Sequence, residues 1–169
     1  SLAGEFGELI AISGMIWESW ASNYAGHWKQ KPEVSGGGFM FDTGAHLMNT
    51  VCLLANSDFA SVGAYMDNRG APVDIVTAAS ARLANGALAT LTAAGEGPKG
   101  CASFISLFFT KAIVRIDAWG GWRELVVDGV EQPRETAEIL GNPLKSFLAI
   151  RAGSMENTGS VEMGLRFAR

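Results

Sequence analysis

The 169-residue sequence lacks several features that would assign it to a class of protein at once. Its two cysteines, Cys52 and Cys101, are too few for a disulfide framework or a cysteine-rich metal site. No apolar run approaches the roughly 18 to 20 residues of a membrane-spanning helix, and no signal peptide is recognisable. No basic run occurs, and the formal charge is -4, so neither nucleic acid nor an anionic membrane is an expected partner. We expect a cytoplasmic protein.

A phosphate-binding motif for a dinucleotide is missing as well. No Gly-x-Gly-x-x-Gly stands between a strand and the helix that such a motif would open. The triple glycine, Gly36 to Gly38, precedes neither such a pattern nor a lysine-serine pair. We therefore expect this chain to bind no cofactor by itself.

What the sequence does contain is enough apolar material for one core. Hydrophobic residues make up 48% of the chain and charged residues only 18%. A chain of this length and composition suits a single globular domain, here residues 1–169.

Strand and turn signals dominate most of the sequence. Asn85-Gly86 predicts a tight hairpin with positive φ at both central residues. Residues 21–32 show neither the helical nor the strand spacing of apolar residues and are predicted to be a loop. The expected strands are 8–20, 61–67, 73–83, 87–94, 102–109, 112–119 and 122–127. Helices are expected at 143–152, with Gly153 as its C-cap, and at 160–169. These elements predict an α+β fold: a mostly antiparallel, open-faced sheet with helices on one face.

Small residues are concentrated in two of these strands, 74–83 and 87–94. A smooth, weakly charged sheet face invites a flat partner, so we expect a homodimer or higher homo-oligomer through the open face. A solvated face is the alternative.

The stretch after the triple glycine predicts a buried helix. Apolar residues recur there at helical spacing and fill the flanks as well: Met40, Phe41, Ala45, Leu47, Met48, Val51, Cys52, Leu54 and Ala55. Asp42, His46 and Asn49 lie at i, i+4 and i+7, on one stripe of this helix. A carboxylate and an imidazole in that arrangement indicate an oriented acid/base pair. Alternatively, Asp42 caps the helix and His46 is a satisfied core histidine.

Two segments resemble a known family. The run Trp28-Lys29-Gln30-Lys31-Pro32-Glu33, followed by Ser35-Gly36-Gly37-Gly38 and Asp42-Thr43-Gly44-Ala45-His46, resembles the W-[RK]-x-x-P-x-x-S-G-G-G-x-x-x-D-x-G-x-H signature of the Gfo/Idh/MocA oxidoreductases. Residues 142–153 and 162–166 resemble the closing segment of the same family. The likeness covers the family's C-terminal half only, so the chain looks truncated.

The resemblance implies a function and a site. The parent would be an NAD(P)-dependent enzyme acting on a sugar or cyclitol hydroxyl or carbonyl. Its nucleotide-binding (Rossmann) domain and a lysine in a Glu-Lys-Pro motif would lie upstream, absent here, so this chain alone should be inactive. His46 would take the hydroxyl proton and Asp42 would orient His46 or the substrate. Trp28, Lys29 and Asn49 are the candidate substrate-binding residues. In this family the open sheet face often pairs subunits.

Other interpretations remain open at this point. Trp28 can cover the edge of the core, and Lys29 can be solvated. His27 with Asp42 and His46 would suggest a divalent metal, but three such ordinary residues are weak grounds, and no metal is expected. The whole chain can also be a non-catalytic, dimeric module for ligand binding or scaffolding.

Overall fold

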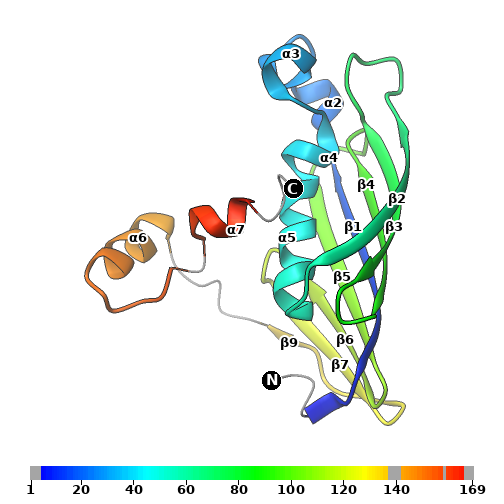
Figure 1. Ribbon diagram of the computed structural model, residues 1–169, viewed down its shortest axis with the longest axis vertical. Coiled ribbons are helices and arrows are strands. Elements are labelled where there is room, and N and C mark those ends of the chain that lie inside the picture. The colour runs from blue at the N-terminus through cyan, green and yellow to red at the C-terminus, as the bar shows by residue number, and fades with distance from the viewer. Residues whose placement is uncertain (1–4, 137–141, 158, 166–169) are drawn as a thin grey trace.

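The computed structural model describes residues 5–136, 142–157 and 159–165, which include one sheet with the helix of residues 44–55 along one face, while the helix of residues 143–151 stands away from the sheet (Figure 1). The described strands are β1 (Leu9–Glu18), β2 (Phe59–Asp67), β3 (Val76–Leu83), β4 (Leu88–Ala94), β5 (Cys101–Phe109), β6 (Ala112–Asp117), β7 (Trp122–Val127), β8 (Val130–Glu131) and β9 (Glu135–Thr136). Their order is β2-β3-β4-β1-β5-β6-β7-β8, with β9 also beside β7. Among these strands only the β1–β4 pair is parallel. The predicted α+β class with a mostly antiparallel sheet is confirmed.

The predicted hairpin at Asn85-Gly86 forms with a different turn. The N–H of Leu83 donates to the carbonyl of Ala87, which closes a three-residue loop. Only Gly86, with φ +93°, adopts positive φ, so the expectation for Asn85 is wrong. Such a loop ends in a left-handed residue that glycine accepts without strain.

Short helices replace the loop predicted at 21–32: α2 (Trp20–Asn23), the 3-10 helix η1 (Trp28–Gln30) and the start of α3 (Pro32–Ser35). Toward the C-terminus α6 (Pro143–Arg151) is close to its predicted bounds, and Gly153 (φ +72°) follows its end. The second predicted helix appears as α7 (Val161–Leu165), and the remainder of that prediction, 166–169, lies outside the described residues. No helix among the described residues has the length and apolar character needed to cross a membrane.

The predicted buried helix is wrong in two respects. It is divided at Thr43 into α4 (Phe39–Asp42) and α5 (Gly44–Ala55). Only one side is buried, since the side chains of Phe41 and Leu53 are 59% and 56% exposed. An apolar residue in this segment is therefore not always buried, and one side of the helix faces solvent.

The core fills the layer between α5 and the sheet. Leu47 and Val51 of α5 are buried against one face, to which β1 contributes Ile12 and Ile16. Gly14 of β1 allows this close approach, because a Cβ there would lie 3.0 Å from Leu47. Figure 1 shows α5 lying along the sheet, with α2, α3 and α4 gathered at one of its ends. That end holds the C-terminus of β1 and the candidate site.

Candidate functional site

The triple glycine positions α4 through contacts with Asp74, which lies two residues before the start of β3. The backbone N–H groups of Gly38 and Met40 donate to the two carboxylate oxygens of Asp74, at 2.7 and 2.9 Å. The N–H of Phe39 donates to the Asp74 carbonyl at 2.9 Å. A Cβ on Gly38 would lie 2.1 Å from that carbonyl oxygen. Glycine is therefore required here for a close backbone approach, and a carboxylate already occupies the amino end of α4.

The described residues consequently do not fit the phosphates of a dinucleotide. The amides of the Gly-rich segment that could meet an anion at α4 are directed at Asp74. Gly95, Gly97 and Gly100 do have the spacing Gly-x-Gly-x-x-Gly, but they connect β4 to β5 and open no helix. Neither of these two glycine segments therefore offers a cradle for the phosphates.

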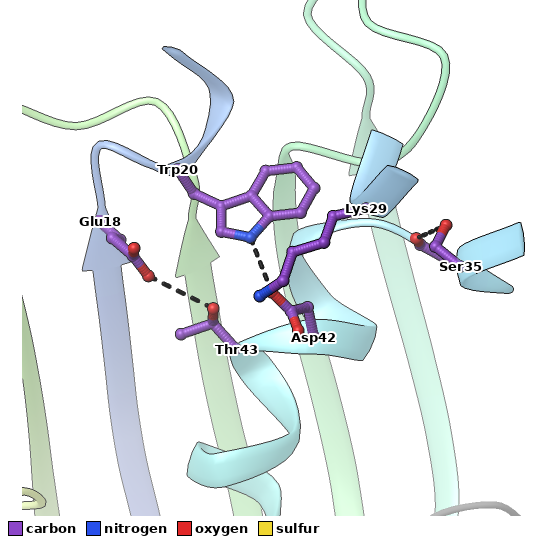
Figure 2. Close-up of polar contacts among 7 residues, drawn as sticks. Glu18, Trp20, Lys29, Ser35, Asp42 and Thr43 are labelled. Atoms are coloured by element: carbon purple, nitrogen blue, oxygen red, sulfur yellow. Dashed lines mark hydrogen bonds and ion pairs between the residues drawn. The ribbon is translucent and has the colours of Figure 1, made fainter. Parts of the chain in front are cut away.

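Asp42, the last residue of α4, accepts two side-chain hydrogen bonds on one oxygen. Trp20 Nε1 donates to Oδ2 at 2.8 Å and Lys29 Nζ donates to it at 2.6 Å (Figure 2). Lys29 and Asp42 are only partly exposed, at 23% and 33% of their side chains, and Trp20 is fully buried. The hydrogen bond to Asp42 raises the pKa of Lys29 above its usual value. The carboxylate is thus oriented by a buried indole and a cation.

A second contact fixes the junction between α4 and α5. The hydroxyl of Thr43 donates to Glu18 at the end of β1, at 3.3 Å (Figure 2). Thr43 keeps a helical backbone, with φ -89° and ψ -36°. The N–H of His46 donates to the Thr43 carbonyl at 3.1 Å, three residues back instead of the four of an α-helix. The chain therefore passes from α4 to α5 through one tighter, 3-10-like turn.

His46 lies in the first turn of α5 in different surroundings. It is exposed, and its ring contacts Trp119, with the ring centroids 6.0 Å apart and the planes inclined by 58°. Within the described residues no hydrogen bond joins His46 to Asp42, whose contacts are with Trp20 and Lys29. The imidazole is therefore open to a ligand, with an aromatic neighbour.

The remaining sequence candidates flank this pair. Trp28 is half exposed and packs against His27, with ring centroids 5.6 Å apart. The Asn49 side-chain oxygen is buried without a hydrogen-bond partner. The structure thus brings Lys29 to Asp42, whereas Trp28 and Asn49 contact neither of them through a hydrogen bond. Among the described residues, no group of three or more His, Cys, Asp and Glu side chains is arranged to hold a metal ion.

Three residues important to this geometry were not found from the sequence: Trp20, Asp74 and Trp119. Trp20 was assigned to the end of a strand, and its role depends on a contact with Asp42 across 22 positions. Asp74 acts across 36 positions. Trp119 had a local signal, since it precedes Gly120-Gly121, a turn sequence that would expose it.

The fold that carries this site at the β1 end is an α+β domain built on one mostly antiparallel sheet. The chain belongs to the GFO/IDH/MocA family: the profile of the family's C-terminal domain matches residues 2–115. No curated protein has a sequence that matches the chain closely enough to count as a relative.

Solved structures share this fold at low sequence identity. An oxidoreductase domain protein from Kribbella flavida has a TM-score of 0.80 at 15% identity, with 97% of this chain and 56% of that one covered. Levoglucosan dehydrogenase, in complex with NADH and levoglucosan, has a TM-score of 0.75 at 14% identity over 93% and 53%. UDP-N-acetylglucosamine 3-dehydrogenase from Acidithiobacillus ferrooxidans has 0.66 at 15% identity over 90% and 48%. The chain spans about half the length of the structures it matches.

Proposed function

We propose that this chain is the substrate-binding and oligomerisation half of an NAD(P)-dependent oxidoreductase that acts on a hydroxyl or carbonyl of a sugar or cyclitol. The observation that supports this most is the exposed imidazole of His46, one turn beyond a carboxylate held by Lys29 and Trp20. Oxidation of an alcohol removes a hydride from carbon and a proton from oxygen. An exposed imidazole is suited to accept that proton near neutral pH.

Each candidate residue has a task in this proposal. His46 accepts the hydroxyl proton during oxidation and returns it during reduction. Asp42, oriented by its two donors, places a fixed negative charge near the site and can accept a substrate hydroxyl with the oxygen that Lys29 and Trp20 leave available. Lys29, Trp28 and Asn49 contact the substrate. The unpartnered buried oxygen of Asn49 is a ready acceptor for a hydroxyl that reaches it.

In this proposal the cofactor is held by an upstream nucleotide-binding domain, since Asp74 already engages the amides of Gly38 and Met40 at the Gly-rich segment. Its nicotinamide would accept the hydride. The solved levoglucosan dehydrogenase is a complex with NADH and levoglucosan, and this chain covers 53% of its length. We place the parent enzyme in the cytoplasm, in keeping with the chain's low cysteine content of two residues.

The experiment joins the chain to the segment encoded upstream of it and measures reduction of NAD⁺ and NADP⁺ with a panel of sugars and cyclitols. The longer protein should reduce one cofactor with at least one substrate. The 169-residue chain should be inactive and leave NADH fluorescence unchanged in a titration. Micromolar NADH binding by the 169-residue chain would contradict the division of labour proposed here.

Oligomerisation is proposed through the sheet face opposite α5. By register, this face carries Tyr65, Leu88, Met15 and Phe104, all exposed. Its centre is formed by small residues of β3 and β4, among them Ala78, Ser80, Thr90 and Thr92, which line a shallow hollow. The centre of this face is uncharged, with Arg82, Arg115 and Glu124 farther out, so that it fits a second copy of the same face.

A substitution at the centre of the face tests this. Thr90→Arg should convert the oligomer to monomers, with Val130→Arg on β8 as the matched control, measured by sedimentation at tens of micromolar. Ala79 and Ala89, the positions suggested by sequence alone, are unsuitable because they face α5 and are only 8% and 2% exposed. A wild-type chain that stays monomeric at this concentration would contradict oligomerisation through this face.

A non-catalytic module for ligand binding or scaffolding is the competing function. It predicts that the longer protein lacks a Gly-rich strand-turn-helix and a Glu-Lys-Pro lysine upstream. It also predicts that no sugar in the panel supports cofactor reduction.

A further inference from the structure

Trp119 lies beside His46 and faces the same solvent. It stands between β6 and β7 and is 46% exposed, although it is one of the largest apolar side chains. Its ring contact with the His46 imidazole joins segments 73 positions apart. Exposure of so much apolar surface is unfavourable, and it is common where a ligand covers the side chain.

The turn that carries Trp119 is fixed by Asp117. One carboxylate oxygen accepts the N–H of Trp119 at 3.0 Å, and the other accepts the N–H of Gly121 at 3.2 Å. Gly120 has φ +88°, and a Cβ at Gly121 would lie 2.6 Å from that second oxygen. The positive φ favours glycine at position 120, and a side chain at position 121 would displace the Asp117 carboxylate. The indole is presented by a hydrogen-bonded support.

We propose that Trp119 is a substrate-contacting residue that selects cyclic substrates. Its indole forms a flat wall on which the apolar C–H face of a sugar or cyclitol ring lies, so that a ring hydroxyl is directed at His46. This inference rests on the proposed function. A flat ring face covers the indole, whereas an acyclic polyol has no such face and loses chain entropy on binding. The same contact restricts the rotation of the His46 ring.

The contact itself is tested in the 169-residue chain by proton NMR, without substrate or cofactor. The chain has only two histidines, so the imidazole signals can be assigned with a His27→Gln variant. Trp119→Leu should shift the His46 signals toward their values in an unfolded peptide, because the indole ring current is lost. Trp119→Phe should restore part of the shift. Unchanged His46 signals in Trp119→Leu would overturn the inference.

Selectivity is tested in the longer protein by comparing kcat/KM for a cyclic substrate and its acyclic polyol. Trp119→Leu should lower the cyclic-to-acyclic ratio by about tenfold or more, mainly through KM, as expected for one lost apolar contact surface. Trp119→Phe should retain most of the ratio, and Val130→Ala should not change it.

The outcomes separate the two proposals. If His46→Ala abolishes turnover while Trp119→Leu keeps the wild-type ratio, the role of Trp119 is wrong and the proposed function stands. If His46→Ala retains turnover, both proposals are wrong: His46 is not the proton acceptor, and Trp119 does not direct a hydroxyl to it.

Discussion

The carboxylate of Asp42 and the imidazole of His46 are one helical turn apart, yet their surroundings are opposite. Asp42 is held by the buried Trp20 and by Lys29, and it is two-thirds covered. His46 is exposed, and its imidazole contacts the ring of Trp119. Asp42 therefore contributes to both the fold and the site, whereas His46 contributes little to the fold. The difference separates their expected mutational effects, since activity should depend most on His46 and stability most on Asp42.

The largest expected effect is on catalysis at His46. In the longer protein His46→Ala should lower kcat by roughly 10² to 10⁴, the usual contribution of a positioned acid or base, with a much smaller change in substrate affinity. Because His46 is exposed, the free energy of unfolding should change by less than about 0.5 kcal/mol. Steady-state kinetics and urea unfolding measure the two quantities.

Met48→Leu is the control for that variant, because Met48 is on the same helix and packs against the core. It should keep near-normal turnover with a small change in stability. If instead His46→Ala turns over normally but unfolds at a clearly lower temperature, His46 is a structural residue and the contrast with Asp42 disappears.

The next effect is on stability at Asp42. In the 169-residue chain Asp42→Ala should lower the free energy of unfolding by about 1 to 3 kcal/mol, because the buried Trp20 N–H loses its acceptor. Asp42→Asn keeps an acceptor oxygen for Trp20 and loses only the charge that Lys29 binds, so its loss should stay near or below about 1 kcal/mol. Urea unfolding of both variants makes the comparison. Equal losses would mean that Trp20 does not depend on this acceptor.

Much of the fold could be predicted from sequence, because strands reveal themselves locally. The alternation in 8–20 gave β1 to within two residues at either end, and Trp122–Val127 matches β7. Neither the parallel pairing of β1 with β4 nor the sheet order could be predicted, since those contacts join distant segments. The helix was predicted to be buried because its apolar residues are numerous, but sequence does not show how many neighbours surround it.

The site was predictable as a set of residues but not as a geometry. The spacing of Asp42, His46 and Asn49 assumes an uninterrupted helix, and Asp74 and Glu18, both distant in sequence, hold the two sides of the junction at Thr43. Lys29 was proposed for substrate hydroxyls, yet it binds Asp42 in the structure. In the proposed function Lys29 therefore contacts the substrate while it also binds Asp42.

A smaller effect is expected at Lys29. Lys29→Met keeps much of the apolar stem and removes the cation, so Asp42 retains only its bond from Trp20. Both partners are partly exposed, which limits the stability loss to about 0.2 to 1 kcal/mol at neutral pH. Lys29→Arg, which keeps the charge, is the matched control in urea unfolding. A loss as large as that of Asp42→Ala would show that the ion pair, and not the indole, holds Asp42.

The smallest expected effect is the pH dependence of that same ion pair. The pKa of Lys29 is raised in the folded chain by its hydrogen bond to Asp42, so the folded state holds this proton more tightly than the unfolded state. The stabilisation is therefore fully present below the ordinary lysine pKa of about 10.4 and is lost as pH rises through the folded pKa. The stability difference between wild type and Lys29→Met should accordingly be constant from pH 7 to 9 and shrink above pH 10. The difference between wild type and Lys29→Arg should grow over the same range, since guanidinium stays charged. A wild-type advantage over Lys29→Met that persists unchanged to pH 12 would mean that the ammonium charge does not stabilise Asp42, leaving the buried indole as its sole support.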